Sequence, residues 1–251
     1  MQAFQSETIK NKKRMEIQEL ERMVQQREAT LSSAFPALMR KVYVWMTLAL
    51  AITGICAYGV ATSPSILQLI YSGGATIWVL FLLELGLVFY TTARIDRLSL
   101  STATSLFVLY SALNGVTLSS IFIVYSMASI AKVFFITAGT FAAMAAYGYF
   151  TKTDLSRFGS ILFMALIGLI IASVVNVFMR SAMFDFILSY VGVAIFVGLT
   201  AWDSQKIKEM LARQADLSEG AQKLALMGAL SLYLDFINLF LYLLRIFGNR
   251  D

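Results

Sequence analysis

The sequence predicts an all-α integral membrane protein with seven transmembrane helices. Hydrophobic side chains make up 59% of the 251 residues and charged side chains only 14%, and the mean hydropathy is +0.73. Water-soluble domains average about 25% charged residues. The segments Val42–Leu83 and Leu98–Ala131 contain no Asp, Glu, Lys or Arg, and uncharged apolar runs of about 18 residues or more are typical of membrane spans. These observations argue against a water-soluble enzyme.

The charged residues mark the ends of the expected spans. We expect these spans at 42–62, 75–93, 99–125, 132–150, 158–179, 185–202 and 224–244. Together they form one transmembrane domain over residues 41–251. Residues 1–40 form a leader in which Ile17, Leu20, Val24 and Leu31 recur at roughly helical spacing among charged residues. This pattern predicts an amphipathic helix at the cytoplasmic face of the membrane.

The basic residues are distributed unequally between the two ends of the spans. Sixteen Lys and Arg residues precede the first span or lie in the loops after the second, fourth and sixth spans, and two lie in the intervening loops. Because basic loops stay in the cytoplasm, the N-terminus is predicted to be cytoplasmic. The same distribution explains the net charge of +5 without a nucleic-acid partner. We expect a bilayer as the surroundings, and a bacterial inner membrane rather than the endoplasmic reticulum.

The absence of histidine restricts the chemistry. The chain contains no histidine and a single cysteine, Cys56, inside the first expected span. This excludes an internal disulfide, a histidine-ligated metal and a Ser/His or Cys/His catalytic pair. We therefore predict neither a cofactor nor an enzymatic activity. Carboxylates must carry out any proton sensing or cation binding.

Three acidic residues lie within or at the end of expected spans. Glu84 is in the second span, Asp203 at the cytoplasmic end of the sixth, and Asp235 near the centre of the seventh. An ionisable residue inside a span costs about 2.5 to 3.5 kcal/mol on insertion scales, so each is a candidate functional residue. By contrast, the small residues Ser111 and Gly115 are expected to let helices approach closely.

The seventh span carries one polar stripe. Spacings of four, three, four and three residues place five polar side chains on one helical face: Ser231, Asp235, Asn238, Tyr242 and Arg245. Such a helix should lie at the centre of the bundle, with its stripe facing a polar pathway or a partner carboxylate. Alternatively, the stripe only holds helices together by hydrogen bonds. Ideal geometry separates the two expected aspartates by about 16 Å in depth, so a direct pair requires a deep or broken seventh helix.

The segments TAWDSQKIK and SLYLDFINLFLYLLR, after a charged leader and six apolar spans, resemble the Bax inhibitor-1 family, also called the transmembrane Bax-inhibitor-motif or YccA-like family. The resemblance extends from about residue 40 to the end of the chain. It implies a central last helix wrapped by the other six, and a pH-sensitive calcium leak. It also implies that Asp203 and Asp235 share a proton as the sensor, and that an arginine after the second helix latches the closed state.

For the latch we favour Arg94 over Arg97, because Arg94 is nearer the bilayer. Glu84 and Arg245 match an acid and a base that the family places within the bundle, which implies an intramembrane ion pair. Two carboxylates at a low-dielectric site cannot both ionise cheaply and therefore share a proton. When both are charged, their oxygens attract a hard cation such as Ca²⁺. We thus expect Asp203 and Asp235 to be both proton sensor and cation-binding site, with protonation weakening the Arg94 latch.

Two other functions fit the same residues. The first is a non-conducting regulator of a membrane protease or of a stress or death pathway, with the leader docking onto a membrane protein partner. The second is a proton-coupled cation exchanger that uses the same carboxylates. An intramembrane protease is the weakest reading, since Lys132 lies only at a span boundary.

Overall fold

The computed structural model describes residues 2–72 and 74–249. Within the N-terminal helix, it describes the side chains of residues 15, 17–24 and 34 onward. Leu31, which the sequence placed on the apolar face of the leader, therefore lies outside the described side chains. The described residues form nine α-helices: α1 (Gln2–Ala61), α2 (Pro64–Tyr71), α3 (Ala75–Arg94), α4 (Leu100–Leu118), α5 (Ile121–Val124), α6 (Met127–Phe150), α7 (Ser156–Met179), α8 (Ala182–Ala212) and α9 (Glu219–Phe247). Seven segments of this part of the chain are long and apolar enough to cross a membrane. The predicted all-α membrane fold with seven spans is thus confirmed.

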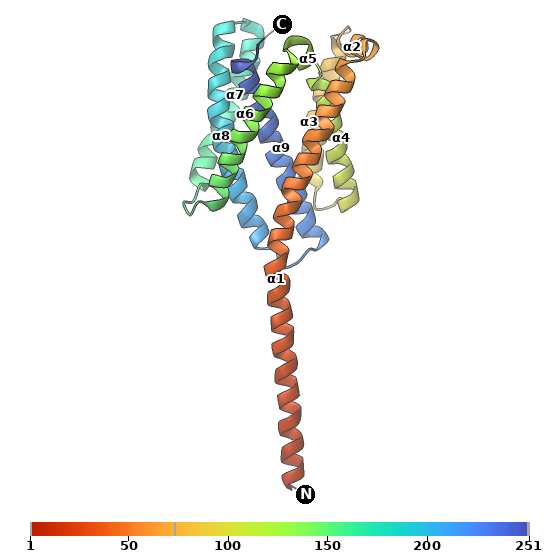
Figure 1. Ribbon diagram of the computed structural model, residues 1–251, viewed down its shortest axis with the longest axis vertical. Coiled ribbons are helices and arrows are strands. Elements are labelled where there is room, and N and C mark those ends of the chain that lie inside the picture. The colour runs from red at the N-terminus through yellow and green to blue at the C-terminus, as the bar shows by residue number, and fades with distance from the viewer. Residues whose placement is uncertain (1, 73, 250–251) are drawn as a thin grey trace.

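The leader and the first span are one continuous helix. Helix α1 passes through the expected boundary at residue 40 without a break, and its apolar segment begins at Ala34, earlier than expected. Arg40 and Lys41, which suggested a boundary, lie on the helix: Arg40 is exposed, and the Lys41 Nζ donates to Gln222 Oε1 of α9 at 2.6 Å. In Figure 1 the N-terminal part of α1 projects from the bundle along its long axis, rather than lying across its end.

Two other boundaries differ from the expected ones because charges mark the edge of the apolar segment, and helical hydrogen bonding continues beyond it. Helix α8 continues past residue 202 to Ala212, and α9 begins at Glu219. Asp203 therefore lies inside α8 and not at its foot. Serine side chains accept a backbone N–H at the first turn of four helices and help to fix where these begin: Ser99, Ser126, Ser181 and Ser218.

Helix α9 lies between two groups of helices (Figure 1), with α6, α7 and α8 on one side and α1, α3 and α4 on the other. Its main neighbours are α8, α1, α6 and α4, whereas α3 packs chiefly on α4 and α7 on α8. In α9, 67% of the membrane window is buried, against 11% in both α3 and α7. The last helix is therefore central, but four helices flank it directly, and α3 and α7 form an outer layer.

Small residues allow the closest helix contacts. A Cβ atom at Gly115 of α4 would lie 2.5 Å from the Thr53 carbonyl oxygen of α1, so the two backbones approach each other as the sequence predicted. Gly148 of α6 lies in the same way against the Ala201 carbonyl of α8.

The ends of the chain lie at opposite ends of the bundle (Figure 1), because α9 is unbroken and runs the full length of the bundle.

Candidate functional site

Asp235 is a buried carboxylate on the central helix. Its side chain lies in the middle of α9 and is 5% exposed. Its Oδ2 atom has no hydrogen-bond partner, and among the described side chains it is the buried polar atom left in this condition. Buried polar groups in folded proteins are almost always hydrogen-bonded. Packing alone therefore gives no account of this carboxylate.

The packing of α8 on α9 brings Asp203 toward Asp235. The two carboxyls are close enough for their charges to interact, and Lys206 is the cation that lies near Asp203 on the same helix. Because α8 continues to Ala212, Asp203 lies about 14 Å above the end of its helix. This extension reduces the ideal depth offset between the two aspartates to about 10 Å. The two carboxyls interact although α9 is unbroken.

Contacts between α8 and α6 fix the rotation of the segment that carries Asp203. Ser204 Oγ donates to the Ala145 carbonyl at 2.8 Å. Gln205 accepts from the Leu155 N–H and donates to the Thr153 carbonyl, each at 2.8 Å, so it anchors the loop between α6 and α7. Sequence reasoning missed Ser204 and Gln205 because it ended the sixth span at residue 202. Their signal was a run of polar residues directly after an aspartate.

Part of the polar stripe of α9 faces α8. The Tyr242 ring packs against Gly192, where a Cβ atom would lie 2.7 Å from the ring, and stacks on Phe196 at 5.9 Å between centroids. Arg245 lies 5.4 Å from the Tyr242 ring centroid. Asn238 donates to the Leu234 carbonyl within its own helix. Ser231 is half-buried. The part of the stripe that faces α8 thus consists of Asp235, Tyr242 and Arg245.

The expected ion pair between Glu84 and Arg245 is not formed in the described structure. Arg245 Nη1 lies 3.5 Å from Asp185 Oδ1 of α8. Glu84 accepts hydrogen bonds from Asn114 Nδ2 at 3.3 Å and from Thr117 Oγ1, both on α4. In this structure the two residues differ in depth, since Glu84 is in the middle of α3 and Arg245 is in the last turn of α9.

The expected latch is also not formed in this structure. Arg94 and Arg97 are both exposed at the end of α3. Helix α3 packs on α4, while Asp203 is on α8, and α9 separates the two groups (Figure 1). The cation near Asp203 is Lys206 instead. Sequence order suggested the latch, but it carried no information on which helices adjoin.

A second polar cluster lies on another side of α9. We call it the Tyr233 network; its members are Thr53, Glu84, Asn114, Thr117 and Tyr233. The Tyr233 hydroxyl lies 2.7 Å from Thr53 Oγ1 and 3.2 Å from Asn114 Oδ1, and Asn114 donates to Glu84. The network therefore joins α1, α3, α4 and α9. Of its five members, sequence reasoning found only Glu84, although an asparagine within an apolar span was a usable signal.

Known proteins are similar to this chain in sequence. The sequence profile of the family described as Inhibitor of apoptosis-promoting Bax1 matches residues 36–251. The chain belongs to the Bax inhibitor-1 family. Inner membrane protein YbhL of Escherichia coli K12 is 51% identical over 214 residues, which cover 84% of this chain and 91% of that protein. A Borreliella burgdorferi protein is 47% identical over 212 residues, or 84% and 91% of the two chains. A Rickettsia prowazekii protein is 44% identical over 221 residues, or 88% and 93%.

The family match confirms the resemblance seen in the sequence, and the chain is an integral membrane protein. For metal chemistry, no group of three or more His, Cys, Asp or Glu side chains gathers within the described residues. Asp203 and Asp235 together supply at most four carboxylate oxygens, whereas Ca²⁺ takes six to eight oxygen ligands. The pair is thus suited to sharing a proton or contacting a cation in passing, and a tightly held metal would need further ligands.

Proposed function

We propose that this Bax inhibitor-1 family member is a pH-sensitive, calcium-permeable leak gated by Asp203 and Asp235. The observation that carries the proposal is the unpartnered Oδ2 of Asp235, buried on the central helix beside a second carboxylate. A carboxylate used only to join helices would have both oxygens hydrogen-bonded. The presence of the Asp235 carboxylate within a membrane span, where ionisable groups are costly, supports a functional role.

The mechanism follows from the position of the pair between α8 and α9. In a low-dielectric site two close carboxylates hold one proton in common, since two adjacent negative charges repel. Gain or loss of that proton changes the charge between the two helices and therefore how closely they pack. With both carboxylates ionised, their oxygens attract Ca²⁺. The ligands of this site are H⁺ and Ca²⁺, and no catalysed reaction is involved.

The test is Ca²⁺ entry into proteoliposomes that contain the purified protein, scanned from about pH 5 to 8. We expect flux that varies with pH in the wild type and loses this dependence in Asp203→Asn and Asp235→Asn. Asp185→Asn is the matched control, because it removes a carboxylate from α8 outside the pair and should keep the pH profile. A dye inside the vesicles reports protons. Proton exit coupled to Ca²⁺ entry would assign an exchanger instead, and absence of flux at every pH would refute conduction.

The same assay tests the latch. If Arg94 holds the closed state in a conformation other than this one, Arg94→Ala raises Ca²⁺ flux at neutral pH. Arg97→Ala is the control at the same end of α3. Unchanged flux in both variants would remove the latch from the mechanism and leave Lys206 as the cation next to Asp203.

A regulatory role is the second candidate, and the projection of α1 from the bundle favours it. Ile17, Leu20 and Val24 are 55%, 57% and 55% exposed on this segment, so an apolar surface is open to a partner. Deletion of residues 2–33 distinguishes the two functions. A leak keeps its Ca²⁺ flux after the deletion, whereas a regulator that docks through this helix loses its partner.

A further inference from the structure

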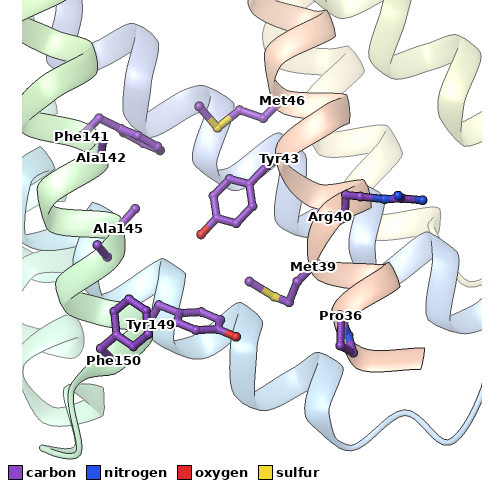
Figure 2. A pocket seen from close by; sticks show the side chains of 11 residues that line it. Pro36, Met39, Arg40, Tyr43, Met46, Phe141, Ala142, Ala145, Tyr149 and Phe150 are labelled. Carbon is purple, nitrogen blue, oxygen red and sulfur yellow. The ribbon is translucent and has the colours of Figure 1, made fainter. Parts of the chain in front are cut away.

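An apolar groove runs between α1 and α6 (Figure 2), with a volume of about 550 Å³. Met39, Tyr43 and Met46 line it from α1, and Phe141, Ala146 and Phe150 line it from α6. In Figure 2 the Tyr43 and Met46 side chains point across the opening toward α6, while the ribbons of α8 and α9 lie behind it. The groove is therefore open between two membrane-spanning helices that do not close against each other.

The groove has the length of one bilayer leaflet. From Pro36 to Met46 the lining extends about 15 Å along the axis of α1, and the hydrocarbon core of a bilayer is about 30 Å thick. Both walls belong to the ends of their spans on the side that the basic residues assign to the cytoplasm. An extended acyl chain of the cytoplasmic leaflet matches this length and this apolar lining.

Two cations lie near the part of the groove that the basic residues assign to the cytoplasmic side. Arg40 belongs to the rim, and Figure 2 shows its guanidinium turned away from the apolar lining. Lys208 of α8 donates to the carbonyl of Tyr149, a lining residue, at 2.7 Å and lies 5.5 Å from its ring centroid. Anionic lipids are concentrated in the cytoplasmic leaflet, and basic pockets between transmembrane helices on that side bind anionic head groups.

We propose that this groove binds one anionic phospholipid of the cytoplasmic leaflet, with an acyl chain between α1 and α6 and its phosphate near Arg40 and Lys208. The site lies against the helices that carry the aspartate pair. The Phe141 ring packs on that of Phe236, next to Asp235, at 5.4 Å between centroids, and the Ala145 carbonyl accepts from Ser204, next to Asp203. The bound lipid closes the membrane-facing side of this region.

The experiment measures lipid retention by the purified full-length protein in detergent, using native mass spectrometry and phosphatidylglycerol or phosphatidylcholine as probes. We expect one phosphatidylglycerol to be retained per chain, in preference to phosphatidylcholine. Arg40→Gln should weaken retention about fivefold, the usual contribution of one basic residue at an anionic surface. Ala146→Trp, which fills the groove, should abolish it. The matched controls are Ala143→Trp, exposed on α6 outside the lining, and Arg97→Gln.

Equal retention of both lipids would overturn the proposal, and so would wild-type binding by the Ala146→Trp variant. A dimer that forms through the groove and resists phosphatidylglycerol would also overturn it, by assigning the groove to a second copy of the chain. The result does not depend on the calcium leak, because binding is measured without any flux. A protein that binds the lipid but conducts nothing refutes the proposed function and leaves this inference standing.

Discussion

The central helix carries two buried polar clusters that differ in one respect. In the Tyr233 network, hydroxyl, amide and carboxylate groups bond to one another across four helices. In the aspartate pair, the Asp235 Oδ2 has no partner. Tyr233 and Asp235 are two positions apart on α9 and therefore face different sides of it. The difference is that hydrogen bonding accounts for the polar groups of the Tyr233 network, whereas it does not account for the Asp235 Oδ2.

The largest effect on stability is expected from loss of the Tyr233 side chain. Tyr233 is fully buried and packs edge-on against Phe107 and Tyr110, at 5.8 and 5.9 Å between centroids. Tyr233→Ala should lower the free energy of unfolding by about 3 to 5 kcal/mol, measured by thermal unfolding in detergent. Asn238→Ala is the control, because the Asn238 side chain bonds within its own helix. A loss no greater than that of the control would contradict the structural role.

Removal of the Tyr233 hydroxyl alone tests whether the network is structural. Tyr233→Phe keeps the ring but leaves Thr53 and Asn114 without this partner, so we expect a loss of about 1 to 3 kcal/mol. The pH profile of Ca²⁺ flux should stay as in the wild type, since the aspartate pair is untouched. A shifted pH profile would mean that the two clusters are coupled, and the distinction between them would fail.

Asp235→Asn should show the opposite behaviour. An amide removes a buried charge that packing does not require, so we expect a change in unfolding free energy of less than about 1 kcal/mol. The same variant should lose the pH dependence of flux entirely. Combining it with Asp203→Asn should add nothing further, because the pair acts as a unit. A large loss of unfolding free energy together with an unchanged pH profile of flux would show that the aspartate pair is structural.

The ion pair between Arg245 and Asp185 should contribute little. Both side chains are more than 40% exposed, and the Nη1 to Oδ1 distance is 3.5 Å. Exposed pairs of this kind contribute about 0 to 1 kcal/mol. A double-mutant cycle with Arg245→Gln and Asp185→Asn, followed by thermal unfolding, measures the coupling energy. A coupling well above this range would show that the contact holds the ends of α8 and α9 together.

The smallest effect is expected at Asp154, outside the spans. The Ser156 backbone N–H donates to Asp154 Oδ1 at 2.8 Å and holds the pKa of this carboxyl below its ordinary value. A lowered pKa in the folded state stabilises the protein above about pH 4, and this stabilisation is lost as the pH falls further. Asp154→Asn should therefore slightly lower the thermal stability above about pH 4, and its difference from the wild type should disappear as the pH falls further. It should not alter flux between pH 5 and 8, so any pH effect there belongs to other groups.

The sequence by itself determined the seven spans and the aspartates worth examining. Lipid requires long uncharged segments, and this requirement is visible residue by residue. The spacing of the polar residues in the last span also indicated a central helix, because a polar stripe must be covered. The helix ends were harder to predict: charges at Arg40 and Asp203 suggested boundaries, but the backbone hydrogen bonds of α1 and α8 continue past them.

Only the tertiary structure decided which groups are partners. Arg245 pairs with Asp185, and Glu84 is held by Asn114 and Thr117. Helix α3, which ends at Arg94, and helix α8, which carries Asp203, lie on different sides of α9. No local pattern in the sequence predicted the unpartnered oxygen of Asp235 or the groove between α1 and α6. The physical reason is that hydropathy and periodicity are properties of one helix, whereas partner choice depends on the depth and neighbours of two.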